Sequence, residues 1–217
     1  MHTIDTVLFD LDGTLLDTAP DMAHALNTLR NYHGLPDLAL AQIRPCVGFG
    51  SKALLKLGFG MDDHHPEYPR LLEEFFAAYD HCLAHSTVLF PEMAAVLNHL
   101  EAKNIPWGIV TNKPARFTSE ILDALDLTRR SAITICGDTL TNRKPHPEPL
   151  LHACKILQRS PATTLYVGDT ITDVQASKAA GTRSLVALYG YISADEDPYA
   201  WQADGYVETA GEIIKWV

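Results

Sequence analysis

The second half of the chain alternates short apolar stretches with segments of helical periodicity, and this alternation constrains the fold more than any other feature. Because strands that alternate with helices are joined by right-handed crossovers, they form a parallel sheet covered on both faces. A first strand starts at Ile4, so the sequence predicts an α/β fold, a Rossmann-like parallel sheet sandwiched by helices. The later strands are expected at 105–110, 132–136, 165–167 and 184–188, and the helices at 91–103, 116–125, 147–157 and 171–180.

Residues 17–87, between the first strand and this alternation, show helical patterns only. Thr18 can cap the first helix, Pro20 fits its first turn, and Gly34 can end it. Further helices are expected at 38–44, 51–57 and 68–84. We therefore expect a small all-helical domain, residues 17–87, inserted after strand one into an α/β core formed by residues 1–16 and 88–217.

The stretch after the last expected strand, residues 189–205, is typical of a loop. It carries four aromatic residues, Tyr189, Tyr191, Tyr199 and Trp201. Aromatic side chains in such a loop either form a rim over a binding site or pack on the surface, and the sequence leaves both interpretations open.

Composition excludes several classes of function. The chain has 217 residues, 47% of them hydrophobic, and a net charge of −10, which argues against a nucleic-acid-binding protein. No apolar run is long enough to span a membrane, and no signal-peptide pattern precedes the first strand, so we expect a cytoplasmic protein. The four cysteines form no CxxC pair, and free thiols are expected.

Polar residues follow the ends of the expected strands. Asp10 and Asp12 end the first strand, although an isolated buried carboxylate is costly unless it is neutralised. Ligands of open α/β sheets bind at the carboxyl ends of the strands. Carboxylates that converge there repel one another unless a cation lies between them, and hard oxygen ligands favour Mg²⁺. The later strand ends carry Thr111-Asn112-Lys113, Arg143-Lys144 and Gly168-Asp169, with Asp173 four residues further on.

These motifs occur in the order that is typical of one large family. The set of Asp10-Leu-Asp-Gly-Thr14, Thr111, Lys144 and Gly168-Asp169 with Asp173 resembles the haloacid dehalogenase superfamily of aspartate-nucleophile phosphatases. The resemblance covers essentially the whole chain, because the helical insert lies where this family places a cap domain. The sequences VTNK, RKPHPEP and YGYI resemble its phosphoglycolate phosphatase branch. Within that branch, the chain is similar to the bacterial N-acetylmuramic acid 6-phosphate phosphatases.

The resemblance implies a role for each carboxylate. Asp10 would attack phosphorus and form an aspartyl-phosphate. Asp12 would protonate the leaving oxygen and then deprotonate the attacking water. Mg²⁺ would be held by Asp10, the main-chain carbonyl of Asp12 and Asp169. Asp173 would orient Lys144 or a metal-bound water.

Phosphate-binding residues are implied in the same way. Thr111, Asn112 and Lys144 would bind the transferring phosphoryl oxygens, Asn112 through its main-chain amide. Main-chain amides around Leu11 and Gly13 would add donors.

Selectivity would come from closure of the helical insert over the site. Hinges are expected near 16–19 and 87–91. Arg44, Gly48, Gly50 and Lys52 are the candidate substrate contacts, because glycines let the backbone approach a ligand and a cation there could meet a substrate carboxylate. A plain loop that joins two helices is the alternative interpretation.

The expected function is Mg²⁺-dependent hydrolysis of a small phosphomonoester metabolite, 2-phosphoglycolate or N-acetylmuramic acid 6-phosphate. The alternative is a sugar phosphomutase or another phosphatase of this superfamily with broad specificity. A dehalogenase needs no metal and hence no Asp12, Asp169 or Asp173, and a signalling receiver needs no helical insert. Neither a nucleic-acid partner nor a membrane partner is expected, and the chain is expected to be a monomer or a dimer.

Overall fold

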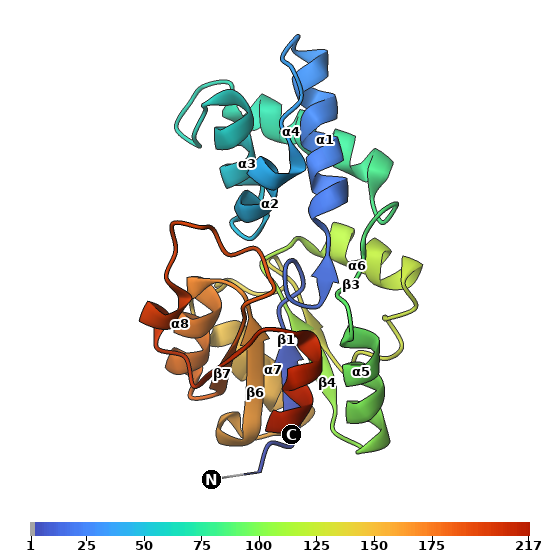
Figure 1. Ribbon diagram of the computed structural model, residues 1–217, viewed down its shortest axis with the longest axis vertical. Coiled ribbons are helices and arrows are strands. Elements are labelled where there is room, and N and C mark those ends of the chain that lie inside the picture. Colours follow the sequence, from blue (N-terminus) through green and yellow to red (C-terminus); the bar gives the residue numbers. More distant parts are fainter. Residues whose placement is uncertain (1–2) are drawn as a thin grey trace.

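The computed structural model describes residues 3–217. Its main sheet has six strands in the order β5-β4-β1-β6-β7-β8, and every pair of neighbours is parallel (Figure 1). This confirms the expected parallel α/β sheet. The strands are β1 (Thr6–Phe9), β4 (Trp107–Val110), β5 (Thr134–Ile135), β6 (Thr164–Gly168), β7 (Arg183–Ala187) and β8 (Gly205–Val207).

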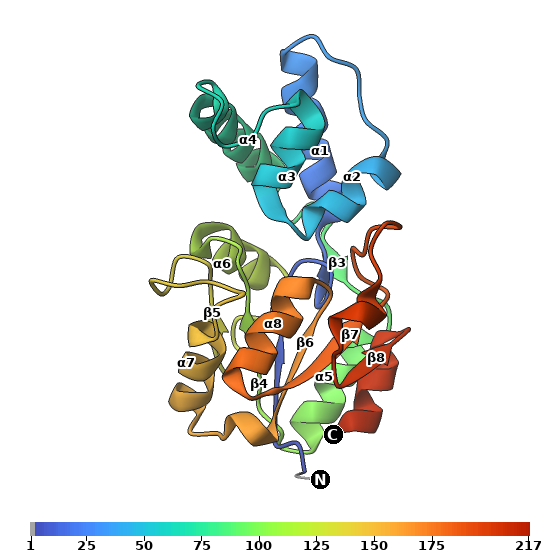
Figure 2. The ribbon, with the colours of Figure 1, turned by 90° about the vertical axis from the view of Figure 1, so that its left-hand side faces the viewer.

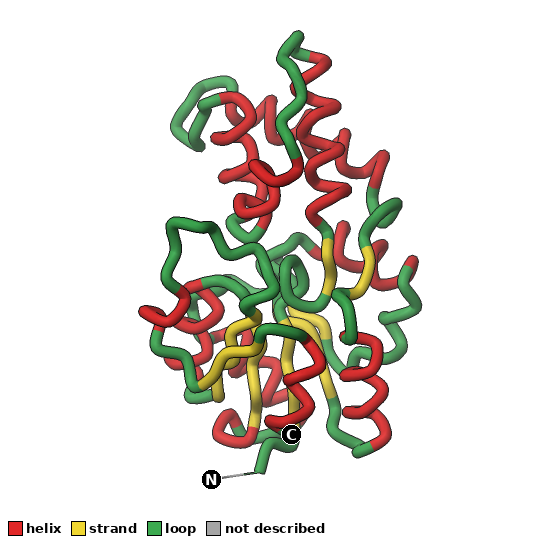
Figure 3. The backbone as a smooth tube through the Cα atoms, viewed as in Figure 1, coloured by secondary structure: helices red, strands yellow, loops and turns green. Residues whose placement is uncertain are grey.

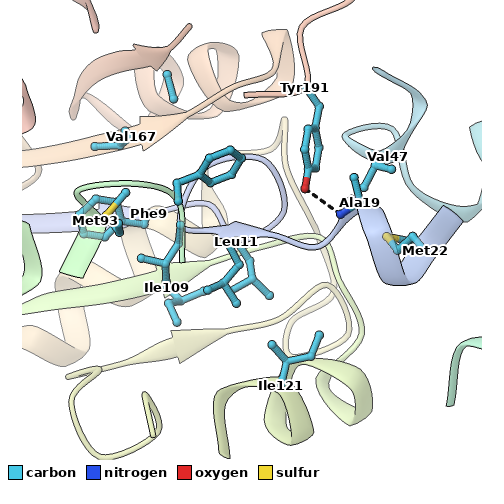
Figure 4. Packing of buried hydrophobic residues seen from close by; sticks show 14 of the residues in the cluster. Phe9, Leu11, Ala19, Met22, Val47, Met93, Ile109, Ile121, Val167 and Tyr191 are labelled. Carbon is cyan, nitrogen blue, oxygen red and sulfur yellow. Dashed lines mark hydrogen bonds between the residues drawn. The ribbon is translucent and has the colours of Figure 1, made fainter. Parts of the chain in front are cut away.

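Helices cover both faces of this sheet, as Figure 2 shows. Alternate residues of β1 point to opposite faces, so Val7 and Phe9 join one apolar cluster and Leu8 joins another. The first cluster includes α5 (Met93–Ala102) and α6 (Ala115–Ala124), and the second includes α7 (Glu148–Leu157) and α8 (Ile171–Ala180). Figure 4 shows Phe9, Ile109 and Met93 packed together in the first cluster.

The insert between β1 and the rest of the sheet consists of four helices, as expected. They gather beyond the carboxyl ends of the strands (Figures 1 and 2). Buried apolar side chains such as Leu26, Leu54 and Phe75 hold them together. The helices are α1 (Ala19–Tyr32), α2 (Leu40–Val47), α3 (Gly50–Phe59) and α4 (Tyr68–Cys82).

Two short strands join the helices to the core. β2 (Leu16–Asp17) pairs antiparallel with β3 (Val88–Leu89), so the outgoing and returning chains run side by side at the expected hinges (Figure 3). Asp21 ties them further, because its carboxylate accepts hydrogen bonds from the backbone amides of Ser86 and Thr87 at 2.8 and 3.0 Å. The sequence did not predict this ribbon, since strands of two residues show no periodicity.

The structure corrects two other expectations. Thr18 occupies the N-cap position of α1 without capping it, because its hydroxyl donates a hydrogen bond to Asp12 Oδ1 instead. The stretch 189–205 is not all loop, because it contains the 3₁₀ helix η2 (Pro198–Trp201) and its last residue begins β8. The chain then ends in η3 (Ala210–Trp216), and a short 3₁₀ turn, η1 (Pro161–Thr163), precedes β6. No helix in the described part of the chain is long and apolar enough to cross a membrane.

Candidate active site

Three buried carboxylates meet at the carboxyl ends of β1 and β6. Asp10 follows β1, Asp169 follows β6, and Asp173 lies in the first turn of α8. One oxygen of each lies within 4.8 Å of the others. The parallel register of β1 and β6 brings these residues together, because Phe9 pairs with Val167 just before the two strand ends. The cluster does not include the side chain of Asp12.

Glycine is required on two sides of Asp169. Gly13 has a φ of +88°, and a Cβ on this residue would collide with the Asp169 carboxylate. A Cβ on Gly190 would collide with Asp169 and with the carbonyl of Gly13. Backbone therefore surrounds this carboxylate closely, and Asp169 also accepts hydrogen bonds from the Thr14 hydroxyl at 3.0 Å and the Tyr191 amide at 2.8 Å.

The electrostatics of the cluster fit a divalent cation. Burial, helped by the charges of Asp173 and Asp12, raises the pKa of Asp10 to about 7, although the neighbouring Lys144 opposes this shift. Burial and the charges of Asp10 and Asp173 also raise the pKa of Asp169 well above its ordinary value. Anionic oxygens that are costly to ionise together are the donors that Mg²⁺ prefers, so Asp10 and Asp169 fit this metal.

Lys144 connects two members of the cluster. Its ammonium lies 2.9 Å from Asp10 Oδ1 and 2.7 Å from Asp173 Oδ1, and it donates to the hydroxyl of Tyr166 at 2.8 Å. Burial opposes the charge on Lys144, but Asp10 and Asp173 outweigh it and raise the pKa of the ammonium. Asp173 is also fixed from the other side, since its Oδ2 accepts from the amide and hydroxyl of Thr170. Lys144 is therefore a fixed, charged group beside Asp10.

Asp12 lies apart from the acidic cluster. Its Oδ1 accepts from the Thr18 hydroxyl at 2.6 Å and from Lys113 Nζ at 3.0 Å. Lys113 is almost fully buried, and its pKa is raised, because Asp12 and Tyr79 outweigh the effect of burial. The sequence placed Lys113 at a strand end, but it did not predict this pair.

The expected phosphate-binding residues Thr111 and Asn112 directly follow β4. The Thr111 hydroxyl accepts from the Lys113 amide at 3.2 Å. The side chain of Asn112 exchanges two hydrogen bonds of 3.0 Å with the backbone of Lys144, so it holds the loop that carries this lysine. Two of the expected donors are already used, since the Leu11 amide donates to Asp10 and the Gly13 amide donates to the Leu16 carbonyl.

The four candidate residues of the helical insert have different surroundings, and not all of them lie beside the site. Arg44 pairs with Asp17 at 2.9 Å, and its guanidinium lies 5.1 Å from the ring centroid of Tyr191. Gly48 lies beside the site, because a Cβ there would contact the side chain of Thr170 and reach Asp169. Gly50, with a φ of +73°, has open space around it. Lys52 pairs with Asp63 at 2.7 Å at the protein surface.

Tyr191, in the aromatic stretch after β7, connects the start of α1 with Asp169. Its hydroxyl accepts hydrogen bonds from the amides of Thr18 and Ala19, the latter drawn in Figure 4, and donates one to Asp17 Oδ1. Its own amide donates to Asp169. Of the two interpretations, this residue supports the one in which the stretch lies against the site. The sequence YGYI was the available signal, but it gave no partner for either tyrosine.

Comparisons of this sequence with known proteins give matches that agree with one another. Residues 7–187 match the family model described as haloacid dehalogenase-like hydrolase. The chain is 42% identical over 210 residues to the N-acetylmuramic acid 6-phosphate phosphatase of Pseudomonas putida, covering 96% of this chain and 94% of that protein. It is 45% identical over 207 residues to the phosphoglycolate phosphatase of Xanthomonas campestris, covering 95% of this chain and 93% of that protein.

Solved structures show the same fold. A crystal structure of a predicted phosphoglycolate phosphatase from Haemophilus somnus superposes with a TM-score of 0.87 at 26% identity, covering 99% of this chain and 98% of that one. One from Lactobacillus plantarum superposes with a TM-score of 0.81 at 22% identity and full coverage of both chains.

Proposed function

The chain belongs to the haloacid dehalogenase-like hydrolases, and we propose that it is a Mg²⁺-dependent phosphatase that acts on a small phosphomonoester through an aspartyl-phosphate on Asp10. The observation that carries this proposal is the meeting of Asp10, Asp169 and Lys144 at one edge of the sheet. Two anionic groups, a carboxylate and a phosphate, have to approach each other here. The fixed charge of Lys144 lowers the repulsion between them.

In the first step, a carboxylate oxygen of Asp10 forms a bond to phosphorus while the bond to the ester oxygen breaks. Asp12 gives its proton to the departing oxygen. In the second step, Asp12 removes a proton from water, whose oxygen attacks phosphorus and releases Asp10 and inorganic phosphate. The contacts with Thr18 and Lys113 hold Asp12 outside the acidic cluster, so Asp12 has to exchange these partners before it reaches the leaving oxygen.

The remaining residues bind and orient the phosphoryl group. Thr111 and Lys144 bind phosphoryl oxygens, Asn112 fixes the Lys144 loop, and Asp173 orients the Lys144 ammonium. Asp10, the Asp12 carbonyl and Asp169 would hold Mg²⁺, whose positive charge would offset the developing charge of the transition state.

The four inserted helices act as a cap over this site in our proposal, with residues 17–87 moving on the β2–β3 ribbon. Gly48 lies beside Asp169 and Thr170, so the turn between α2 and α3 reaches the site. The relatives are named as phosphatases of 2-phosphoglycolate and of N-acetylmuramic acid 6-phosphate. Both compounds carry a carboxylate. We take these two as the candidate substrates of this chain.

The test is phosphate release from a panel of phosphorylated metabolites, ranked by kcat/KM, with and without Mg²⁺. We expect turnover of p-nitrophenyl phosphate and a preference for one of the two carboxylate-bearing candidates. EDTA should abolish turnover, and Mg²⁺ should restore it. Isomerised sugar phosphate without free phosphate would indicate a mutase instead, and full activity in EDTA would contradict the metal-dependent mechanism.

A further inference from the structure

A second buried lysine lies beside the site, and the phosphoryl chemistry does not use it. Lys113 follows β4, its side chain is 4% exposed, and its ammonium donates to Asp12 Oδ1 at 3.0 Å. An ammonium carries three donors, and Asp12 satisfies one of them. A buried cation with unused donors is costly, which makes it a candidate for a ligand contact.

An unpartnered hydroxyl lies against the same lysine. Tyr79 of α4 places its ring centroid 4.8 Å from Lys113 Nζ, and the residue is 1% exposed. Among the described residues, its hydroxyl is the buried side-chain oxygen that has no hydrogen-bond partner. Burial raises the pKa of Tyr79 to about 12, so the hydroxyl remains a neutral donor. The lysine comes from the core and the tyrosine from the helical insert; Figure 2 shows α4, which carries Tyr79, above α6, which begins two residues after Lys113.

The position of Asp12 places this pair on the leaving-group side. The acid for the leaving oxygen is Asp12, whose Oδ1 lies 3.0 Å from Lys113 Nζ, so the leaving oxygen lies on the same side of the site as Lys113. In 2-phosphoglycolate a single methylene separates the ester oxygen from the carboxylate. A carboxylate at that position reaches the ammonium while the phosphate occupies the Lys144 side.

We propose that Lys113 and the Tyr79 hydroxyl form the subsite for the substrate's carboxylate, which takes the place of Asp12 on Lys113 as the insert closes. This inference rests on the function proposed above and names its substrate class: phosphomonoesters with a carboxylate adjacent to the ester carbon. The exchange keeps the charge on Lys113 paired, and it frees the Asp12 carboxyl group to turn toward the leaving oxygen. Arg44 is a weaker candidate, because Asp17 and the ring of Tyr191 already hold its guanidinium.

Binding of two phosphonates tests the subsite without catalysis. In 3-phosphonopropionate a methylene replaces the ester oxygen of 2-phosphoglycolate, and in propylphosphonate a methyl group also replaces the carboxylate. With Mg²⁺ present, calorimetry on the wild-type protein should show tighter binding of 3-phosphonopropionate by about 10- to 100-fold, the range expected for charge-assisted hydrogen bonds. Lys113→Met should remove most of this preference while leaving the affinity for propylphosphonate within about threefold. Lys215→Met is the matched control, because Lys215 also pairs with a carboxylate, Glu212, but at the surface.

Tyr79→Phe provides an independent variant, because it removes only the hydroxyl and keeps the buried ring against Lys113. It should reduce the preference by several-fold, and it decides the question if Lys113→Met does not fold.

An unchanged preference in either folded variant would overturn the proposal. Equal weakening of both phosphonates by Lys113→Met would also overturn it, because that result indicates that Lys113 only holds Asp12. A wild-type protein that hydrolyses p-nitrophenyl phosphate but shows no preference would refute the subsite alone. A protein that neither hydrolyses this ester nor binds either phosphonate would refute the proposed function with it.

Discussion

Asp10 is the residue on which the proposed chemistry depends most directly. Its carboxylate is the expected nucleophile, so Asp10→Asn should lower phosphate release from p-nitrophenyl phosphate by about three orders of magnitude or more. The fold should persist, because the raised pKa of Asp10 means that its charge is unfavourable in the folded protein, and Lys144 keeps its contact with Asp173. Thermal unfolding should show a melting temperature no lower than that of the wild type, measured without metal at pH 7.5.

An exposed carboxylate gives the control for this substitution. Asp195→Asn changes the same functional group at the surface and should leave both turnover and melting temperature unchanged. Substantial turnover by purified Asp10→Asn would contradict covalent catalysis at this residue.

At the scale of single residues, the sequence predicted which groups meet but not every contact that they make. Asp10, Asp169 and Lys144 were predictable as neighbours, because the ends of parallel strands lie at one edge of a sheet. The pair of Lys113 with Asp12 was not predictable, because Asp12 comes from a loop and its rotamer decides which partner it takes. The hydroxyl of Tyr191 was missed for the same reason, since its partners lie more than 170 positions away in the chain.

The first turn of α1 depends on a hydrogen-bond acceptor from another element. The Tyr191 hydroxyl accepts from the Thr18 and Ala19 amides at 2.7 and 2.9 Å, and all three residues are buried. Tyr191→Phe leaves these amides unpaired, so we expect the free energy of unfolding to fall by about 1–3 kcal/mol in urea titrations. The Tyr191 amide still donates to Asp169, so Mg²⁺ affinity measured by calorimetry should change little.

Tyr206→Phe is the comparison for this element. The Tyr206 hydroxyl accepts from the Ala203 amide at 3.2 Å and donates to the Tyr199 carbonyl at 3.3 Å, but Tyr206 and Ala203 are only half-buried, so its loss should cost less, about 1 kcal/mol. Equal destabilisation by the two variants would show that Tyr191 gives no special support to α1.

Among the elements, helices were predictable and short strands were not. The helix predicted at 171–180 coincides with α8, and the one predicted from Tyr68 ends two residues earlier, at Cys82. Apolar residues at helical spacing repeat several times in such segments. β8 has three residues and the β2–β3 ribbon has two per strand, and their pairing comes from tertiary contacts that no local pattern encodes.

For the whole molecule, the acidic cluster couples metal binding to pH and stability. Burial raises the pKa of Asp10 from 3.8 to about 7, so between these pH values the folded protein binds more protons than the unfolded chain. The contribution of Asp10 to stability is therefore lost as the pH rises through this window, with a slope of at most about 1.4 kcal/mol per pH unit. Asp169, whose pKa is also raised, adds to the effect in the same direction.

Mg²⁺ should reverse this loss, because it takes the place of protons between Asp10 and Asp169. We expect the melting temperature to rise on addition of Mg²⁺ by a larger amount at pH 7.5 than at pH 5, measured at constant ionic strength with K⁺ as the control. In EDTA, the wild type should lose stability relative to Asp10→Asn as the pH rises from 5 to 7.5, since the amide cannot ionise. The net charge of −10 opposes the compact state of the whole protein at neutral pH, so the comparison with Asp10→Asn isolates the local effect. A Mg²⁺ shift of equal size at both pH values would show that protons and metal do not compete for this cluster.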